Sequence, residues 1–300
     1  MKFDEFLYSH LGDMGKFQKI QFILVCLPSI ITSMHSLSWT FAGVSVPFRC
    51  EDIPINASCA TDCYDSVCNP PGADVCATHY GFDHNSNIRL SATERWEIVC
   101  DRSWIKAFIQ ASYYVGQGIG SMLCGFFGDK YGRKPVFLVA LTLQIIFGLL
   151  LSVATHWPIY AAARLALGIM HPGATVVAVI IGMELLGASH RKLAAIVVAL
   201  FFSFGQVFLG TLASNVTDYQ WLHVAITTPA ILFLSYYVLV SESARWLVST
   251  KKFDEAGVVL KKAARMNGVT LPPEWRELLD TEKEEPDDDD DDDDGKKKKK

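Results

Sequence analysis

The sequence has little charge and no basic excess. Only 20% of its 300 residues are charged, and the formal net charge of −5 is distorted by an aspartate run at 287–294 and a lysine run at 296–300. Binding to nucleic acid leaves an electrostatic footprint of clustered Lys and Arg. No such basic excess is present, so we expect no nucleic-acid partner.

The chain also lacks the residue patterns of an enzyme. It has no Gly-rich phosphate loop ending in Lys and Ser or Thr, no nucleophile with a placed base, and no metal triad. We therefore expect no enzymatic activity, no cofactor, no metal and no direct use of ATP. A cleavable signal peptide is not expected either, because the first apolar run follows a polar N-terminus and is too long for a signal sequence.

Long apolar runs are abundant, since 50% of the residues are hydrophobic. A helix that crosses the bilayer core needs about 20 apolar residues. Six windows reach this length: 20–41, 105–127, 136–154, 159–183, 193–213 and 222–240. Their number, and the short polar turns between most of them, disfavour buried helices of a soluble domain. The sequence predicts an all-α membrane protein with six transmembrane helices, the first at 20–41 and the others within 105–240.

The basic residues predict the orientation of these helices, because Lys and Arg concentrate on the cytoplasmic side of a membrane. They lie in the N-terminal segment 1–19, after the second and fourth windows, and in the segment 241–280: Lys2, Lys16, Lys19, Lys130, Arg133, Lys134, His190, Arg191, Lys192, Arg245, Lys251 and Lys252. All fall on one side if both termini are cytoplasmic. We expect a multi-pass protein of the plasma membrane, with segment 42–104 as a large extracellular loop.

That loop holds six of the eight cysteines: Cys50, Cys59, Cys63, Cys68, Cys76 and Cys100. An even number in an exposed loop predicts three disulfides in an oxidising compartment, and 15 pairings are possible. A zinc site is the alternative, although the spacing is loose for zinc ligands. Asn56 begins a glycosylation sequon in the loop, whereas the sequon at Asn215 lies close to the membrane and is expected to stay unmodified. Cys26 and Cys124 lie in apolar windows, where we expect them to be packing residues.

The stretch 94–135 carries the motifs that point to a family. Its end, Gly125-x3-Asp129-x2-Gly132-Arg133-Lys134, resembles the loop between the second and third helices of the major facilitator superfamily. The preceding Trp96-Glu-x-Val99-Cys100-Asp101-Arg102, followed by Gln110-Ala-Ser and Gly116, resembles the organic ion transporter family, which includes organic cation, organic anion and carnitine carriers. The resemblance implies the N-terminal half of a twelve-helix carrier.

Three later motifs agree with this resemblance: Arg164-x3-Gly168, Glu184-x6-Arg191, and Ser241-Glu242-Ser-Ala-Arg245-Trp246-Leu247. The last is similar to the family's Pro-Glu-Ser-Pro-Arg-Trp-Leu, with both prolines replaced. Glu184-x-x-Gly187 favours the cation and carnitine branch over the anion branch. In similar transporters such charges form a network that closes the inner gate, which implies a gate network of Asp129, Gly132, Arg133, Lys134, Glu184, Arg191, Glu242 and Arg245. The alternative is that the charges only set the topology.

Local chemistry adds expectations for three parts of these motifs. Gly132 suits a tight turn that needs a positive backbone dihedral. Gly116, Gly120 and Gly125 predict close helix packing. Arg164 lies in an apolar window, where a charge is costly and implies a partner or a function, but snorkelling to the membrane surface is an equal alternative.

In this fold the substrate site lies near the bilayer midplane between two halves. The polar and aromatic residues of helices one, two, four and five are therefore the cavity candidates, and aromatic rings attract organic cations. They are His35, Trp39, Tyr113, Gln117, His171, Phe202 and Gln206.

The C-terminal part predicts a short amphipathic helix at 254–266 and a disordered tail at 281–300. The lysine run is expected to be the reading of an A-rich tract, with the aspartate run before it read from a repeat of GAT or GAC. The alternative is a genuine charged tail or an electrostatic lipid anchor. The first functional hypothesis is a carrier of small organic ions, acting as half of a larger carrier or as a homodimer. The second is a non-transporting membrane protein that binds and regulates full-length relatives.

Overall fold

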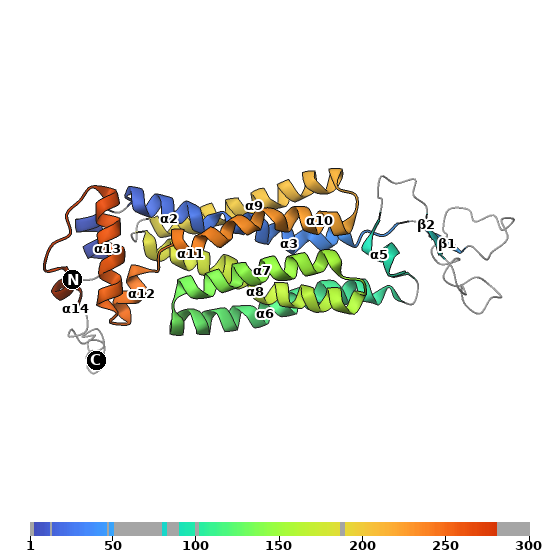
Figure 1. The fold of residues 1–300 in the computed structure, drawn as a ribbon, viewed down its shortest axis with the longest axis horizontal. Helices are drawn as coiled ribbons and strands as arrows, with labels where there is room; N and C mark the ends of the chain where they lie inside the picture. The colour runs from blue at the N-terminus through green and yellow to red at the C-terminus, as the bar shows by residue number, and fades with distance from the viewer. Residues whose placement is uncertain are drawn as a thin grey trace, which may run out of the picture.

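The structure is a computed structural model that describes residues 3–12, 14–46, 48–50, 80–82, 90–99, 102–186 and 190–280. Long helices run along the long axis of an elongated molecule (Figure 1). In chain order they are α2 (Lys16–Cys26), α3 (Pro28–Ala42), α6 (Trp104–Tyr131), α7 (Arg133–Val153), α8 (Trp157–Leu185), α9 (Arg191–Asn215), α10 (Tyr219–Thr227), the 3₁₀ helix η4 (Thr228–Ser235) and α11 (Tyr236–Leu239).

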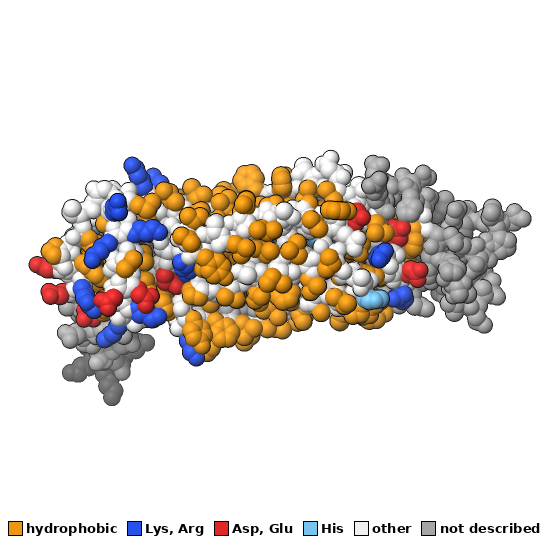
Figure 2. Space-filling view, in the orientation of Figure 1, with side chains coloured by type: hydrophobic (Ala, Val, Ile, Leu, Met, Phe, Trp, Pro, Cys, Tyr) orange, Lys and Arg blue, Asp and Glu red, His pale blue; other side chains and the backbone are white. Residues whose placement is uncertain are grey.

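Short elements close the two ends of this bundle (Figure 1). One end, called the α13 end below, carries α1 (Phe3–Phe6), the π-helix η1 (Leu7–Leu11), α12 (Ala244–Ser249), α13 (Phe253–Asn267) and α14 (Trp275–Asp280). The opposite end, called the α5 end, carries α5 (Ala92–Arg95), β1 (Phe48–Cys50) and β2 (Tyr80–Phe82). Figure 2 shows apolar side chains along the middle of the visible face and charged side chains gathered over the α13 end.

Five helical segments are long and apolar enough to cross a membrane: Lys16–Ala42, Arg133–Val153, Trp157–Leu185, Lys192–Asn215 and Tyr219–Leu239. They correspond to five of the six predicted spans. The predicted second span forms α6, which has 28 residues and is therefore about 42 Å long at 1.5 Å per residue. Its composition includes Lys106, Gln110, Gln117 and several glycines, which lower its hydropathy. Its membrane crossing remains a prediction.

The last predicted span is not one regular α-helix. Thr228–Ser235 form a 3₁₀ segment between α10 and α11. Pro229 lies at its start and has no backbone N–H to donate to the preceding turn, which weakens the α-helical ladder there. The segment nevertheless stays helical from Tyr219 to Leu239, so that its length still suits a span.

The chain is mostly helical but not all-α. β1 and β2 pair antiparallel, with Arg49 opposite Gly81. An isolated bridge joins Leu90 to Asp218 and ties the loop to the turn before α10. The other calls for this loop fall on residues outside those described, which include Asn56, Cys59, Cys63, Cys68, Cys76, Cys100 and the side chain of Cys50.

Glycines bring α6 and α8 into direct backbone contact. A Cβ added at Gly116 would collide with the carbonyl of Leu165, and one at Gly120 would collide with that of Ile169. Gly168 on α8 meets the carbonyl of Tyr113 in the same way. These positions behave as the sequence predicts, whereas Gly125 has open space where its Cβ would lie and takes no part in this contact.

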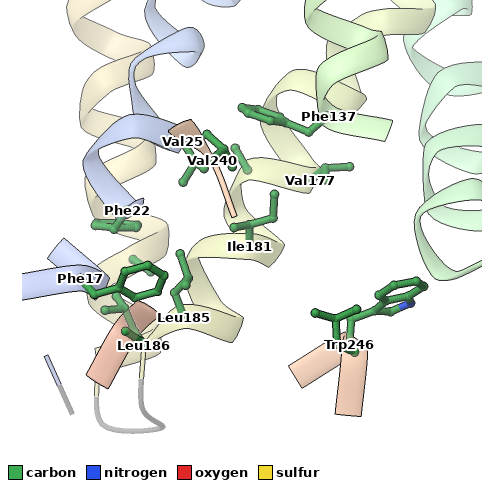
Figure 3. Close-up of a cluster of buried hydrophobic side chains, with 14 of the residues drawn as sticks. Phe17, Phe22, Val25, Phe137, Val177, Ile181, Leu185, Leu186, Val240 and Trp246 are labelled. Atoms are coloured by element: carbon green, nitrogen blue, oxygen red, sulfur yellow. The ribbon is translucent and has the colours of Figure 1, made fainter. Parts of the chain in front are cut away.

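A buried apolar cluster joins the spanning helices to the α13 end. Figure 3 shows Phe22 of α2, Phe137 of α7 and Ile181 of α8 among its members. The cluster continues through Trp246 into the buried face of α13 and the N-terminal Phe3 and Phe6. The described N-terminal residues from Phe3 to Leu11 are thus packed against the elements that follow the last span.

Candidate functional site

The turn between α6 and α7 carries the first group of candidate residues. Gly132 ends α6 with φ +110° and ψ 161°, and α7 begins at Arg133. A residue with a Cβ rarely adopts this backbone conformation. A Cβ at Gly132 would also lie 2.5 Å from Oε2 of Glu242 and 3.1 Å from the Trp246 ring. Glycine is therefore needed both for the turn and for the approach of α12.

Glu242 caps the N-terminus of α7. Its Oε1 accepts the backbone N–H of Arg133 at 3.1 Å and that of Lys134 at 3.0 Å. The same oxygen accepts the N–H of Ser243 at 2.9 Å. The first N–H groups of a helix have no partner within the helix and carry its positive dipole end, so a carboxylate is well suited to bind them.

Arg133 joins α7 to two neighbouring helices. Its guanidinium lies 3.0 Å from Oδ1 of Asp129 and 3.3 Å from Oε1 of Glu184, and it donates to the carbonyl of Gly128 at 2.8 Å. The side chain of Asp129 is 78% exposed, whereas those of Arg133 and Glu184 are only 16% and 13% exposed. Because screening by water weakens exposed ion pairs, the Arg133–Glu184 pair is the stronger of the two.

The structure thus gathers Asp129, Gly132, Arg133, Lys134, Glu184 and Glu242 in one place, called the α7 cluster below. Trp246 completes it, because its indole N–H donates to the carbonyl of Asp129 at 3.0 Å. The membership of the other two predicted residues, Arg191 and Arg245, stays a prediction. Arg245 lines a separate cavity at the α13 end, and Arg191 begins α9 with a side chain outside the described set.

We expect Gly132→Ala to destabilise the purified chain by about 1–3 kcal/mol, the usual cost of a strained backbone position. The added methyl group also displaces Glu242 from its cap. The measurement is the thermal unfolding midpoint in detergent. Gly125→Ala is the matched control on the same helix, where no atom obstructs the new Cβ and alanine is the better helix former. Equal midpoints for the two variants would contradict the requirement for glycine at 132.

A second group of candidates surrounds Arg164 in the α8 segment. Arg164 is fully buried. Its Nη1 donates to the carbonyl of His35 at 2.7 Å and to Oγ of Ser38 at 3.1 Å, both on α3, and its Nη2 donates to Oε1 of Gln110 on α6 at 3.0 Å. The guanidinium also lies 4.6 Å from the ring centroid of Tyr113. Arg164 therefore binds inside the bundle rather than snorkelling to the surface.

The cavity candidates separate by burial. His35, Trp39, Tyr113 and His171 are buried, whereas Gln117, Phe202 and Gln206 are half-buried. The hydroxyl of Tyr113 hydrogen-bonds to Nδ1 of His171 at 2.8 Å, and His171 contacts the ring of Phe202 edge-on. Trp39 packs on Tyr160 instead, with its indole N–H bonded to the carbonyl of Lys106.

Sequence reasoning missed two polar pairs within the apolar windows. Tyr160 hydrogen-bonds to Nε2 of the buried His223 at 2.8 Å, and Thr227 lies 3.4 Å from Nε2 of His35. It also missed Gln21, which bonds both to the carbonyl of Leu239 and to the N–H of Ser241. The available signal was a lone polar residue in an apolar run, since such residues need partners in a membrane.

The chain is similar to known membrane transporters. The family model "Sugar (and other) transporter" matches residues 73–292. An organic cation transporter protein of Drosophila melanogaster is 34% identical over 307 residues, which cover 93% of this chain and 56% of the relative. Organic cation/carnitine transporter 2 of Homo sapiens is 27% identical and covers 87% of this chain and 54% of the relative. The chain spans about half the length of these curated relatives.

The proton:xylose symporter XylE, in its structure bound to 6-bromo-6-deoxy-D-glucose, has a similar fold, with a TM-score of 0.57 at 19% identity over 88% of this chain and 54% of that one. This likeness shows a mostly helical fold like that of the major facilitator superfamily. The chain belongs to the sugar (and other) transporter family, and its resemblance to the organic ion transporters is confirmed by its relatives.

Proposed function

We propose that this chain takes part in the transport of small organic ions by alternating access, as the N-terminal half of a twelve-helix carrier. An organic cation or a carnitine-like zwitterion is the favoured substrate, and an organic anion is the alternative within the same family. The observation that carries the proposal is the α7 cluster in a chain whose relatives are named organic cation and carnitine transporters.

In the membrane arrangement that we propose, α6 also crosses the membrane, as the second of six spans. Apolar side chains such as Phe108, Ile119 and Phe126 are exposed along α6, which suits contact with lipid or with another half. Basic residues gather at the α13 end (Figure 2), which supports a cytoplasmic location for that end and for both termini. The loop 42–104 then lies outside the plasma membrane, with three disulfides and a glycan on Asn56.

The α7 cluster is suited to hold the cytoplasmic end closed. Arg133 and Glu184 link α6, α7 and α8, and Glu242 and Trp246 add the start of the α12 segment. An inward opening that separates these elements therefore breaks several polar contacts together. A single exposed ion pair contributes only about 0–1 kcal/mol. A half-buried pair combined with a helix cap biases a two-state equilibrium by a few kcal/mol, which is enough to shift populations.

The substrate path in this proposal passes the half-buried residues Gln117, Phe202 and Gln206, with His171 behind them. These three side chains are partly exposed in this half alone, as is expected for residues that face a second half. The buried His35, Trp39 and Tyr113 are better suited to hold the helices of this half in place.

The low burial of α9 supports a second candidate function. Only 22% of the α9 window is buried within the chain, against 50–67% for Lys16–Ala42, Arg133–Val153 and Trp157–Leu185. Side chains such as Phe204 and Val207 of α9 are therefore available to another protein. A non-transporting half that pairs with full-length relatives, or with a second copy of itself, is consistent with this surface.

We expect cells that express this chain alone to take up labelled carnitine and a labelled quaternary ammonium cation no faster than vector controls, after correction for surface abundance. The path of this fold lies between two halves, and one half leaves it open to lipid. Co-expression with a full-length relative separates the two functions, since a regulator changes the relative's uptake. Saturable uptake by the chain alone that Glu184→Gln abolishes would overturn the expectation and indicate an assembled homodimer.

A further inference from the structure

The buried Arg164 carries a full positive charge, but its partners are all neutral. They are the carbonyl of His35, the hydroxyl of Ser38 and the amide oxygen of Gln110. Its Nε has no hydrogen-bond partner among the described residues. No Asp or Glu is among the buried polar side chains of the described part of the chain, and the ion pairs found there do not include Arg164.

A buried charge without a countercharge is unusual. The guanidinium stays protonated inside proteins, and a buried charge normally has an opposite charge close by. Backbone carbonyls are also common partners of charges within a membrane, and His35 supplies one. A carbonyl carries only a partial negative charge, so the positive charge of Arg164 is not neutralised. Because the surroundings are poorly polarisable, an anion that reaches this guanidinium is attracted strongly.

Gln110 is the partner through which an anion can reach Arg164. His35 and Ser38 are buried, whereas Gln110 is half-buried on α6. Its Oε1 lies 3.0 Å from Nη2 of Arg164. A carboxylate binds a guanidinium more strongly than a neutral amide does. Rotation of the Gln110 side chain therefore offers Nη2, the outermost part of the guanidinium, to a better acceptor.

The position of Gln110 on α6 connects Arg164 to the proposed substrate path. Lys106, Gln110 and Gln117 are all half-buried, and their spacing of four and seven residues places them on one face of the helix. Gln117 belongs to the proposed path. Gln110 lies about 10 Å from it along the helix axis, toward the α5 end. Lys106 follows one turn further and adds a second positive charge to this face.

We propose that Arg164 receives the carboxylate of the transported substrate, which displaces the amide oxygen of Gln110. This inference rests on the proposed transport function and narrows its substrate to an organic ion that carries a carboxylate. A carnitine-like zwitterion or an organic anion meets this requirement, whereas a simple organic cation does not. The groups that hold Arg164 come from α3 and α6 of this chain, so carboxylate binding does not require a second half.

The test measures ligand binding to the full chain, purified into phosphatidylcholine nanodiscs and titrated calorimetrically. The probes are carnitine and carnitine amide, which keeps the quaternary ammonium but has a neutral amide in place of the carboxylate. We expect carnitine to bind at least about tenfold more tightly, as for the gain of a charge-assisted hydrogen bond. Benzoate, a carboxylate without an ammonium, is the third probe.

Two substitutions of Gln110 make opposite predictions. Gln110→Glu places a carboxylate of the chain itself beside Arg164. We expect the unfolding midpoint to rise by about 2–4 °C, the scale of one added favourable contact, and the preference for carnitine over its amide to disappear. Gln110→Ala removes the competing amide oxygen, so this variant is expected to bind carnitine at least as tightly as the unaltered chain.

Gln220→Glu is the matched control. Gln220 is half-buried at the start of α10 and is not a partner of Arg164. An added acidic group is favourable in the first turn of a helix. We expect this variant to keep the preference for carnitine within about twofold, because changes at sites without shared partners act independently.

The outcomes separate this inference from the transport function on which it rests. Binding of benzoate as well as carnitine assigns the site to any carboxylate, and binding of carnitine alone assigns it to a zwitterion; both support the proposal. Equal affinity for carnitine and its amide, a preference that survives in Gln110→Glu, weaker carnitine binding by Gln110→Ala, or no binding of any probe would overturn it. Selective binding of carnitine without uptake in the presence of a second half would contradict the transport function alone.

Discussion

Replacing Arg164 with methionine is expected to lower the unfolding midpoint of the purified chain by at least about 5 °C, equivalent to a loss of roughly 2.5–3.5 kcal/mol. In the folded bundle the guanidinium is fully buried and bonded to α3 and α6. When the helices separate, the same charge faces lipid or detergent, which is costly. The arginine therefore favours the assembled state, and methionine of similar length removes that preference.

Two further variants separate the charge of Arg164 from its shape. Arg164→Lys keeps the charge, but one ammonium does not reach both α3 and α6, which different guanidinium nitrogens contact. We expect it to recover less than half of the loss. Lys106→Met is the control, because Lys106 makes one exposed hydrogen bond to Ser45, and we expect a change below about 1 kcal/mol. Full recovery by lysine would show that the charge alone matters.

Removing the charge of Glu242 is the second change with a large expected effect. Glu242→Gln replaces a carboxylate that accepts backbone N–H groups of Arg133, Lys134 and Ser243. The amide loses the negative charge and directs an NH₂ group at the positive end of α7. We expect a loss of about 1.5–3 kcal/mol, the usual value for hydrogen bonds to a charged group, measured as the shift in the thermal unfolding midpoint.

Asp129→Asn provides the comparison for this prediction. Its side chain is 78% exposed and pairs with Arg133 across the turn between α6 and α7. Such exposed pairs contribute about 0–1 kcal/mol, so the midpoint is expected to change little. The structure thus ranks Glu242 above Asp129 for holding the cluster together. A larger effect of Asp129→Asn than of Glu242→Gln would contradict this ranking.

Much of the candidate site could be predicted from the sequence, because its motifs depend on local backbone and side-chain properties. Gly132 was predicted to need a positive φ, since a glycine between two helices and next to charged residues is typical of a tight turn, and its φ is +110°. The motif residues Glu184 and Glu242 were named as members of one network, and both contact the N-terminal turn of α7.

Other features were beyond reach of the sequence because they depend on which faces of the helices meet. The alternatives for Arg164 could be decided only once α3 and α6 were seen to supply its acceptors. Gly116 and Gly125 look alike in the sequence, but one contacts the backbone of α8 and the other faces open space. In α13, Val258 is apolar, but the fold leaves its side chain 69% exposed.

The sequence by itself determined the class of this protein, because apolar length, charge placement and turn residues are local properties that need no knowledge of packing. It determined five helices that are able to span a membrane and the family to which the chain belongs. The tertiary structure alone decided the partners of each polar side chain. A hydrogen bond between helices far apart in the chain, such as that of Arg164 to His35, depends on the rotation and depth of both helices, and these are set by the packing of all the others.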